Sequence, residues 1–309
     1  LRSIYPYLSA MRKRSRHLAK NNDYAKRFYF LLKNNVIGPD GIGFQARTKR
    51  ENGELDIKDN RFLESQWKAF CKLGTPTVDG QLSMREACNL FLETIARDGE
   101  IFVRMVPGFD NRFGFAVQLV EPDLVDHHLN TVYKPTGNTV RMGVELDAWR
   151  RPVAYHVKRM DDLQRFSMFS EATEYHTGKY DRIPADLMFH RFVVDRIGQT
   201  RGVPWMHTAA RRLQMLGGYE EAELVAARTA AAKMGFFKSK TGDEWSGDTG
   251  TADDENVENS PPVYAEAGTF DELPEGMDFV KWDPDHPTTA FEQFVLAVLR
   301  GAASGLNVS

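Results

Sequence analysis

The sequence predicts an α+β fold, with helices at both ends of the chain and an antiparallel-rich sheet in the middle. Up to residue 98, apolar residues recur at the spacing of amphipathic helices. From Glu100 to His190 they alternate with a period near two, as half-buried strands do. After Pro204 a helical period returns, interrupted by a polar, glycine-rich stretch.

Helix signals divide the N-terminal part. Helices are expected over residues 2–35, with a break near Asn22, and over residues 61–72 and 83–98. Asn is a preferred N-cap, which favours the break. Ser83 and Glu86 form a capping box, in which each side chain satisfies a backbone donor of the other residue. Residues 44–60 are polar and predict a hairpin or an exposed loop.

The middle of the chain predicts strands over residues 100–106, 113–120, 140–146 and 152–157, and residues 183–190 lead into the segment before the next helix. A long helix is then expected from Pro204, because proline suits a first helical turn. At ~1.5 Å per residue, about thirty helical residues would span roughly 45 Å. Gly217 and Gly218 lie in its middle and would each cost about 1 kcal/mol relative to alanine, so a kink or break could occur there.

The last third of the chain contains an insertion and a second helix. Residues 238–259 are rich in Gly, Asp, Thr and Ser and predict an exposed insertion. A short strand is expected over residues 278–282. Thr289 and Glu292 form a second capping box, and the helix that follows places its apolar residues on one broad face.

Composition excludes several functional classes. The chain has 309 residues, is 42% hydrophobic and carries a net charge of −3, so bulk charge does not predict nucleic-acid binding. Cys71 and Cys88 fit no zinc or disulfide pattern, and no cofactor is expected. Without a long apolar run or a leader pattern, a soluble intracellular protein is expected. The chain begins at Leu1 and stops soon after a helix, so we expect a segment of a longer protein.

Few residues suggest chemistry. Asp126, His127 and His128 could bind a metal, but no second ligand cluster supports this. A hydrolase could use one of these three residues or His190, which lies close to Asp195, but no serine or cysteine lies in a nucleophile elbow. We expect His190 to be a packed or hydrogen-bonded residue at a strand end. Glu121 and Asp123 could act as an acid–base pair or merely end a strand. No catalytic constellation is evident, and we expect no enzymatic activity and no metal.

One alternative function rests on the basic run Arg12–Arg16. Such a run in a helix could contact phosphate, which would make the chain a monomeric DNA-binding module. More often, however, such a run is a solvated helix face.

Several short motifs follow one another in an order that is specific to one family. They are Arg14-Ser15-Arg16 with Asn21-Asn22 and Ala25; Gly38 with Gly41-Ile42 and Gln45; Arg97–Glu100; Val117–Asp123; Gly143–Leu146 with Arg151-Pro152 and Ala154-Tyr155; Ile183-Pro184-Ala185 with His190; Gly198–Trp205; Tyr219 with Ala222-Glu223-Leu224 and Ala226-Ala227; and Leu273-Pro274 with residues 276–300. In this order they resemble the portal proteins of lambda-type tailed bacteriophages over essentially the whole chain.

The resemblance implies a structural role in the virion. Portal proteins form rings, typically dodecamers, at the unique capsid vertex and surround a channel for double-stranded DNA. The implied partners are other copies of the chain, DNA, the terminase, head–tail connector proteins, and the major capsid and scaffold proteins. The implied location is the portal vertex of the virion, with assembly in the host cytoplasm and no membrane.

The resemblance also implies a division of the chain. Residues 1–203 would be an α/β wing, 204–234 the first stem helix, 235–287 a small α/β clip, and 288–309 the second stem helix leading to a tunnel loop. Residues expected at the wing–stem junction or a subunit interface are Arg191, Arg196, Arg201 and Trp205; alternatively, they order one turn within a subunit. Expected channel-facing residues are Arg228, Gln293 and Arg300, and expected clip contacts are Lys238, Lys240, Asp253, Asp254 and Glu255.

Overall fold

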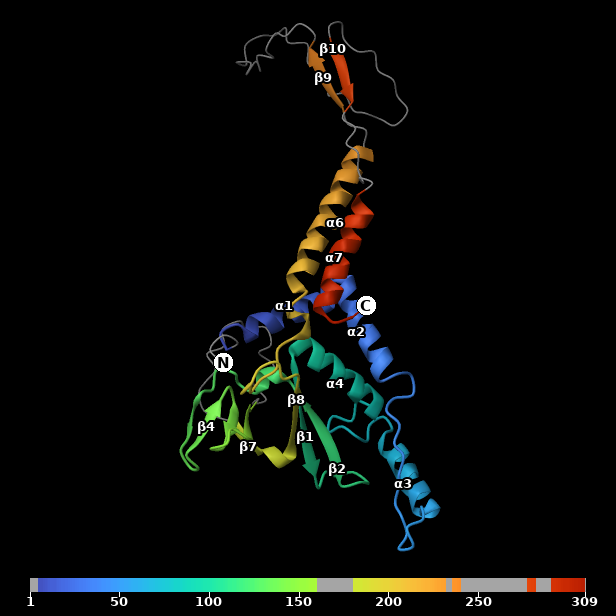
Figure 1. Cartoon of the computed structure of the whole chain (residues 1–309), viewed down its shortest axis with the longest axis vertical. Coiled ribbons are helices and arrows are strands. Elements are labelled where there is room, and N and C mark those ends of the chain that lie inside the picture. Colours follow the sequence, from blue (N-terminus) through green and yellow to red (C-terminus); the bar gives the residue numbers. More distant parts are fainter. Residues whose placement is uncertain (1–4, 160–179, 232–234, 240–276, 282–289, 309) are drawn as a thin grey trace, which may run out of the picture. The chain divides into compact units, whose positions relative to one another are not determined.

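The computed structural model in Figure 1 describes residues 5–159, 180–231, 235–239, 277–281 and 290–308. It contains two compact units. Unit 1 comprises Leu1–Met215 and Ala297–Ser309, and unit 2 comprises Leu216–Leu296. The predicted α+β class is confirmed. The unit boundaries lie within two long helices and do not coincide with residues 203, 234 and 287, so the division into wing, stem and clip stays a prediction.

Four helices open unit 1: α1 (Leu8–Asn21), α2 (Asp23–Val36), α3 (Ile57–Phe70) and α4 (Met84–Asp98). The expected break after α1 is confirmed, because the side chain of Asn22 accepts a hydrogen bond of 3.0 Å from the Ala25 amide. The capping box of Ser83 and Glu86 is also confirmed. Helix α3 begins earlier than expected because Asp56 caps its first turn.

Two antiparallel sheets follow. The first has the order β2-β1-β8, with β1 at Glu100–Pro107, β2 at Phe115–Val120 and β8 at Met188–Phe192. The second has the order β3-β4-β5-β6-β7, with strands at Thr131–Tyr133, Asn138–Arg141, Val144–Leu146, Pro152–Lys158 and Tyr180–Pro184. Short 3-10 turns η1 (Pro122–Leu124) and η2 (Ala185–Leu187) precede β3 and β8.

The prediction of a single strand over residues 140–146 was wrong. Met142 and Gly143 have positive φ angles of 50° and 81°, and Arg141 pairs directly with Val144. Two residues with positive φ form the tight turn of a two-residue hairpin, which matches the twist of the flanking strands. The sequence signal was weak because methionine rarely adopts this conformation.

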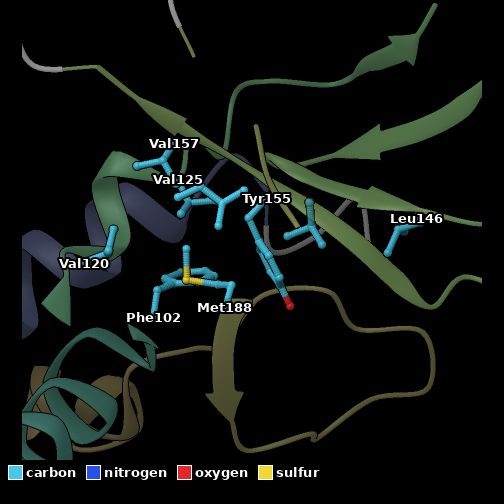
Figure 2. Close-up of a cluster of buried hydrophobic side chains, with 9 residues drawn as sticks. Phe102, Val120, Val125, Leu146, Tyr155, Val157 and Met188 are labelled. Atoms are coloured by element: carbon cyan, nitrogen blue, oxygen red, sulfur yellow. The ribbon is translucent and has the colours of Figure 1, made fainter. Parts of the chain in front are cut away.

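The main apolar core of unit 1 lies between the two sheets (Figure 2). Phe102 from β1 and Met188 from β8 contribute from the first sheet, and Tyr155 and Val157 from β6 contribute from the second. Val125 follows η1 and is completely buried. This core fixes the start of β1, which carries the charged residues described below.

A second core joins the helices of unit 1. Leu18, Ala25, Tyr29 and Ala96 come from α1, α2 and α4. They pack with Met206 and Ala209, which precede helix α6 (Ala210–Ala231), with Leu213 in the first turn of α6, and with Ala302 in the last turns of α7 (Phe291–Gly305). The amphipathic pattern of the N-terminal helices therefore serves to hold the ends of two later helices.

These later helices are α6 (Ala210–Ala231) and α7 (Phe291–Gly305). The prediction that the first one starts at Pro204 was wrong: Pro204 precedes the 3-10 turn η3 (Trp205–His207), and α6 begins at Ala210. Gly217 and Gly218 do not break it. Within the described residues, no helix combines the length and apolar character that crossing a bilayer requires.

Two strands of unit 2, β9 (Gly235–Ser239) and β10 (Met277–Lys281), pair antiparallel. The expected strand near residue 278 is thus confirmed. The predicted cap at Thr289 lies outside the described residues.

Candidate functional site: a buried ion network before helix α6

The centre of the site is Glu100, the first residue of β1, which is completely buried. One carboxylate oxygen, Oε1, accepts a hydrogen bond of 2.7 Å from Arg201 Nε and another from Arg12. The other oxygen, Oε2, lies 2.9 Å from His190 Nε2 and accepts a bond of 2.9 Å from the Gly202 amide. Four separate segments of the chain therefore meet at one carboxylate.

Arg201 holds the loop that leads into α6. Its Nη1 donates to the carbonyl oxygens of Val125 (2.8 Å) and Met142 (2.6 Å), and its Nη2 donates to that of Pro122 (2.9 Å). Together with the bonds to Glu100, these contacts use the donors that a guanidinium offers. Arg201 is thus an inter-element contact within one chain.

A second layer of ion pairs surrounds this centre. Arg12 Nη1 donates to Asp123 at 2.9 Å. Arg16 bridges Asp98 (2.7 Å) and Asp123 (2.6 Å). On the outer side Arg16 also lies 3.2 Å from Glu121. Helix α1 is therefore attached to the end of α4 and to the segment after β2 by ion pairs that run from the buried Asp98 to the exposed Glu121.

The surroundings of Glu100 shift the pKa values of the groups in this network. Burial would raise the pKa of Glu100, but the charges of Arg201 and Arg12 outweigh it and hold the pKa well below its usual value. Burial lowers the pKa of His190, despite its bond to Glu100, so its neutral form is favoured. Burial also lowers the pKa of Arg201. For Asp123, Arg12 and Arg16 outweigh burial and lower the pKa.

Two glycines make this arrangement possible. Gly99 ends α4 with a left-handed φ of 91°. A Cβ at Gly99 would overlap the backbone of Val203, and a Cβ at Gly202 would overlap the backbone of Gly99. The chain entering β1 and the loop that follows Arg201 therefore touch backbone to backbone, which brings the Gly202 amide to Glu100.

The network changes the interpretation of two sequence features. In the basic run of α1, Arg12 is buried and Arg16 faces carboxylates, so only part of the run is available to solvent. Glu121 and Asp123 bind Arg16 and so serve in ion pairs at the strand end. Sequence reasoning missed Arg12 and Glu100 as partners. The available signal was a carboxylate at the first position of a strongly apolar strand.

The suspected histidines occupy different places. His190 contacts Glu100 and stacks on Phe102 with ring centroids 4.1 Å apart. Asp126 accepts from the Tyr180 hydroxyl at 2.9 Å and lies 3.1 Å from Lys158 Nζ. Burial lowers the pKa of His127 to about 4. Across the described ranges, no group of three or more potential ligand side chains is arranged to hold a metal ion.

The other predicted junction residues are distributed over the same loop. The Arg191 guanidinium lies over the Phe189 ring, 4.4 Å from its centroid. Arg196 is exposed. Trp205 packs on the second core, where its buried indole nitrogen has no hydrogen-bond partner among the described residues. Of the four residues, Arg201 therefore belongs to the buried network.

The predicted channel residues lie on the two long helices. Arg228 is exposed near the end of α6. Gln293 and Arg300 are both exposed, and their spacing of seven places them on one side of α7, whereas Ala302 is buried. Among the clip candidates, Lys238 pairs with Asp278 across β9 and β10. Lys240, Asp253, Asp254 and Glu255 lie outside the described residues.

Comparison with known proteins decides the family. The model of the family described as phage portal protein, lambda family, matches residues 2–309. The chain belongs to this portal family. The predicted family is thereby confirmed, and the family is a structural one. The ordered motifs found in the sequence, including Gly198–Trp205 around Arg201, are thus motifs of a lambda-type portal chain.

One curated relative and one solved structure are similar to this chain. A probable portal protein of Halomonas phage phiHAP-1 is 38% identical over 307 residues, which cover 99% of this chain and 58% of that relative. The portal chain therefore spans 58% of the length of this curated relative. A chain in the solved structure of the neck of an empty GTA particle is also similar, with a TM-score of 0.50 and 14% identity. The match covers 97% of this chain and 68% of the chain in that structure. At this identity the likeness concerns the fold alone.

Proposed function

We propose that this chain is a ring-forming portal subunit that builds the conduit for double-stranded DNA at the unique vertex of a phage capsid. The observation that carries the proposal is the match of the lambda portal family over residues 2–309. The solved neck structure to which the fold is similar was computed with C6 symmetry. A symmetric ring, of twelve copies by the family resemblance, is the expected assembly, with the virion as its location.

The distribution of charge supports a conduit more than a DNA-binding module. A channel must allow a polyanion to slide, and dense phosphate contacts would oppose this. The chain carries a net charge of −3, and the N-terminal basic helix directs Arg12 into the protein. On α7, Gln293 and Arg300 offer one polar and one cationic side chain on a shared exposed side. We assign these residues, with Arg228, to the channel wall.

The proposed partners follow from the same role. The terminase would dock during packaging, and head–tail connector proteins would replace it afterwards. The β9–β10 pair and the residues around it would form the docking element, and the capsid and scaffold proteins would contact the outside of the ring. A structural role without catalysis accords with His190 and Asp126, which are bound in contacts that stabilise unit 1.

The test is the assembly state of the purified protein. Light scattering coupled to gel filtration and electron micrographs of the same fractions should show closed rings with a central channel. A protein that stays monomeric at high concentration and binds DNA tightly in a salt-sensitive manner would overturn the proposal and favour the DNA-binding alternative.

A further inference from the structure

The two cysteines of the chain meet where helix α3 ends and helix α4 begins. Cys71 is the C-cap residue of α3, and its carbonyl oxygen accepts a hydrogen bond of 3.1 Å from the amide of Met84, the first residue of α4. Cys88 follows on α4 one helical turn after Met84. In Figure 1, α3 lies beyond one end of α4. The backbone therefore holds Cys71 at the N-terminal end of the helix that carries Cys88.

The direction of helical side chains brings the Cys88 thiol toward this junction. Each Cα–Cβ bond in an α-helix is tilted toward the N-terminus, so a side chain covers the turn before its own residue. The turn before Cys88 begins at Met84, whose amide binds Cys71. Burial and, after it, the charge of Cys88 raise the pKa of the Cys71 thiol. Because this effect of one charge on the other decreases with distance, it agrees with two neighbouring thiols.

Both thiols are free and half-buried. Burial raises the pKa of Cys88 as well. Catalytic cysteines and those that bind metals instead have a lowered pKa, caused by a nearby cation, a metal or a helix N-terminus. Among the residues that the structure describes, no three potential ligand side chains are grouped to hold a metal ion. The chemistry that the arrangement offers is therefore a reaction of the two thiols with each other.

The segment between the two cysteines is ordered. The Val78 amide donates to the Val117 carbonyl of β2 at 3.0 Å, and the Val117 amide donates to the Pro76 carbonyl at 2.8 Å. The capping box of Ser83 and Glu86 fixes the first turn of α4. A disulfide needs its two Cα atoms within about 7 Å of each other. An ordered junction keeps the cysteines together and so favours a bond between them over bonds to other molecules.

We propose that Cys71 and Cys88 are an intrachain disulfide site, which closes when a low-molecular-mass disulfide such as oxidised glutathione is present. One cysteine thiolate attacks a sulfur of the oxidant, forms a mixed disulfide and releases one glutathione thiolate. The second cysteine thiolate then attacks the protein sulfur of the mixed disulfide and releases the other glutathione thiolate. The two cysteines are oxidised, the oxidant is reduced to two glutathione thiols, and these take up the two protons that the cysteines lose.

The disulfide fastens the end of α3 to the first turns of α4. Cytosolic thiols are kept reduced, whereas disulfides persist outside the cell and on virion surfaces. In the proposed virion role, the pair is therefore open during assembly in the host and closes after the particle is released. This timing rests on the proposed function, but the thiol pair itself does not.

Oxidation of the purified full chain tests the site. The folded, reduced protein is incubated with oxidised glutathione at about pH 9, where more of each thiol is ionised, and is then denatured for a thiol count with dithionitrobenzoate. We expect the count per chain to fall from two to none. A non-reducing peptide map should show the peptide with Cys71 linked to the peptide with Cys88. A chain that keeps both thiols, or carries glutathione on both cysteines, would overturn the inference.

Mixed isotopes show whether the bond lies within one chain. Heavy and light chains are mixed in equal amounts before oxidation, and the linked peptides should then be heavy with heavy or light with light. Heavy–light pairs at the frequency of random pairing would contradict an intrachain site. Gel filtration of the same sample reads the assembly state separately. Rings without the disulfide would contradict this inference alone, and the disulfide without rings would contradict the proposed function alone.

Single variants provide the matched controls. Cys71→Ser and Cys88→Ser each leave one thiol without its neighbour, so each should retain one glutathione after the same treatment, whereas the wild type should retain none. Oxidation should raise the unfolding temperature of the wild type by roughly 5 °C or more, because a crosslink restricts the unfolded chain. Neither variant should show this rise. Equal unfolding temperatures for oxidised and reduced wild type would contradict a bond that fastens α3 to α4.

Discussion

Glu100 is a carboxylate that remains charged without water because two arginines and two further hydrogen-bond partners surround it. Removing two charges from water costs several kcal/mol per ion, so such a pair is a weak source of stability by itself. Its effect is specificity: when one member is lost, the other charges remain buried without compensation. The network therefore requires one arrangement of α1, β1 and the loop before α6.

Substitution of Glu100 tests this asymmetry. Glu100→Gln should lower the free energy of unfolding by about 3–5 kcal/mol, because Arg12 and Arg201 keep their charges in a buried site. Glu121→Gln removes a carboxylate from an exposed pair with Arg16 and should cost less than about 1 kcal/mol. Urea denaturation of both variants measures the difference. Similar losses of unfolding free energy for the two variants would show that the buried, unpaired arginine charges do not cause the loss in Glu100→Gln.

His190 makes stability depend on pH. Its pKa in the folded chain is lowered by burial, whereas the unfolded chain takes up the proton near pH 6.5. The unfolded state thus binds more protons as the pH falls below about 6.5, and stability declines by up to about 1.4 kcal/mol per pH unit for each such group. His190→Gln keeps a donor for Glu100 but cannot titrate, so we expect a flatter decline between pH 6.5 and 5. If the stability of the variant and of the wild type fell in parallel with pH, His190 would not be the group that titrates.

The sequence predicted these residues only in part. Arg201 was singled out because it lies in a family motif, and His190 was expected to be packed at a strand end. Arg12 could not be distinguished from Arg14 by residue type. The choice between a solvated and a buried arginine depends on the rotation of α1 against β1, which is a tertiary property.

At the scale of elements, the close approach of Gly99 and Gly202 sets the geometry between α4, β1 and the loop before α6. Gly99→Ala should destabilise the chain by more than the roughly 1–2 kcal/mol that a left-handed alanine costs, because its Cβ would overlap Val203. Gly53→Ala is the matched control, since Gly53 also has a positive φ but open space around it. Thermal unfolding should separate the two variants, and equal shifts would contradict the packing argument.

In helix α6, in contrast to Gly99, a change from glycine to alanine should stabilise the protein. Gly217 and Gly218 have open space at their Cβ positions and lie inside a continuous helix. Each change to alanine should therefore stabilise the helix by about 1 kcal/mol, seen as a higher unfolding temperature. A loss of stability would show that the helix bends at this pair in the folded protein.

Most helices and strands could be predicted from local sequence signals, and the wrong predictions also have local causes. Capping residues located the starts of α2 and α4, and alternation located β1 and β2. The start of α6 was placed too early, because Pro204 is equally suited to the 3-10 turn η3. The turn at Met142 was missed because a non-glycine residue with positive φ leaves no trace in the pattern.

At the scale of the whole molecule, the proposed ring has an inside and an outside. Gln293→Cys and Arg300→Cys, each with Cys71→Ser and Cys88→Ser, should react with a small maleimide in rings and in dissociated chains alike. A maleimide bearing a long polymer should label them much more slowly in rings, because the channel restricts its entry. Unchanged polymer labelling on ring assembly would contradict the channel-wall assignment.

The span of the Glu100 network in the sequence also orders events during synthesis. Glu100 precedes Arg201 by 101 residues and follows Arg12 by 88 residues. The ribosome adds roughly 5–20 residues per second, so Arg201 is synthesised on the order of 5–20 s after Glu100. Until then Glu100 has only Arg12 as an arginine partner, and α1 cannot be fixed in its final place. The loop before α6, with Arg201 and Gly202, is thus the last part of the Glu100 network to leave the ribosome.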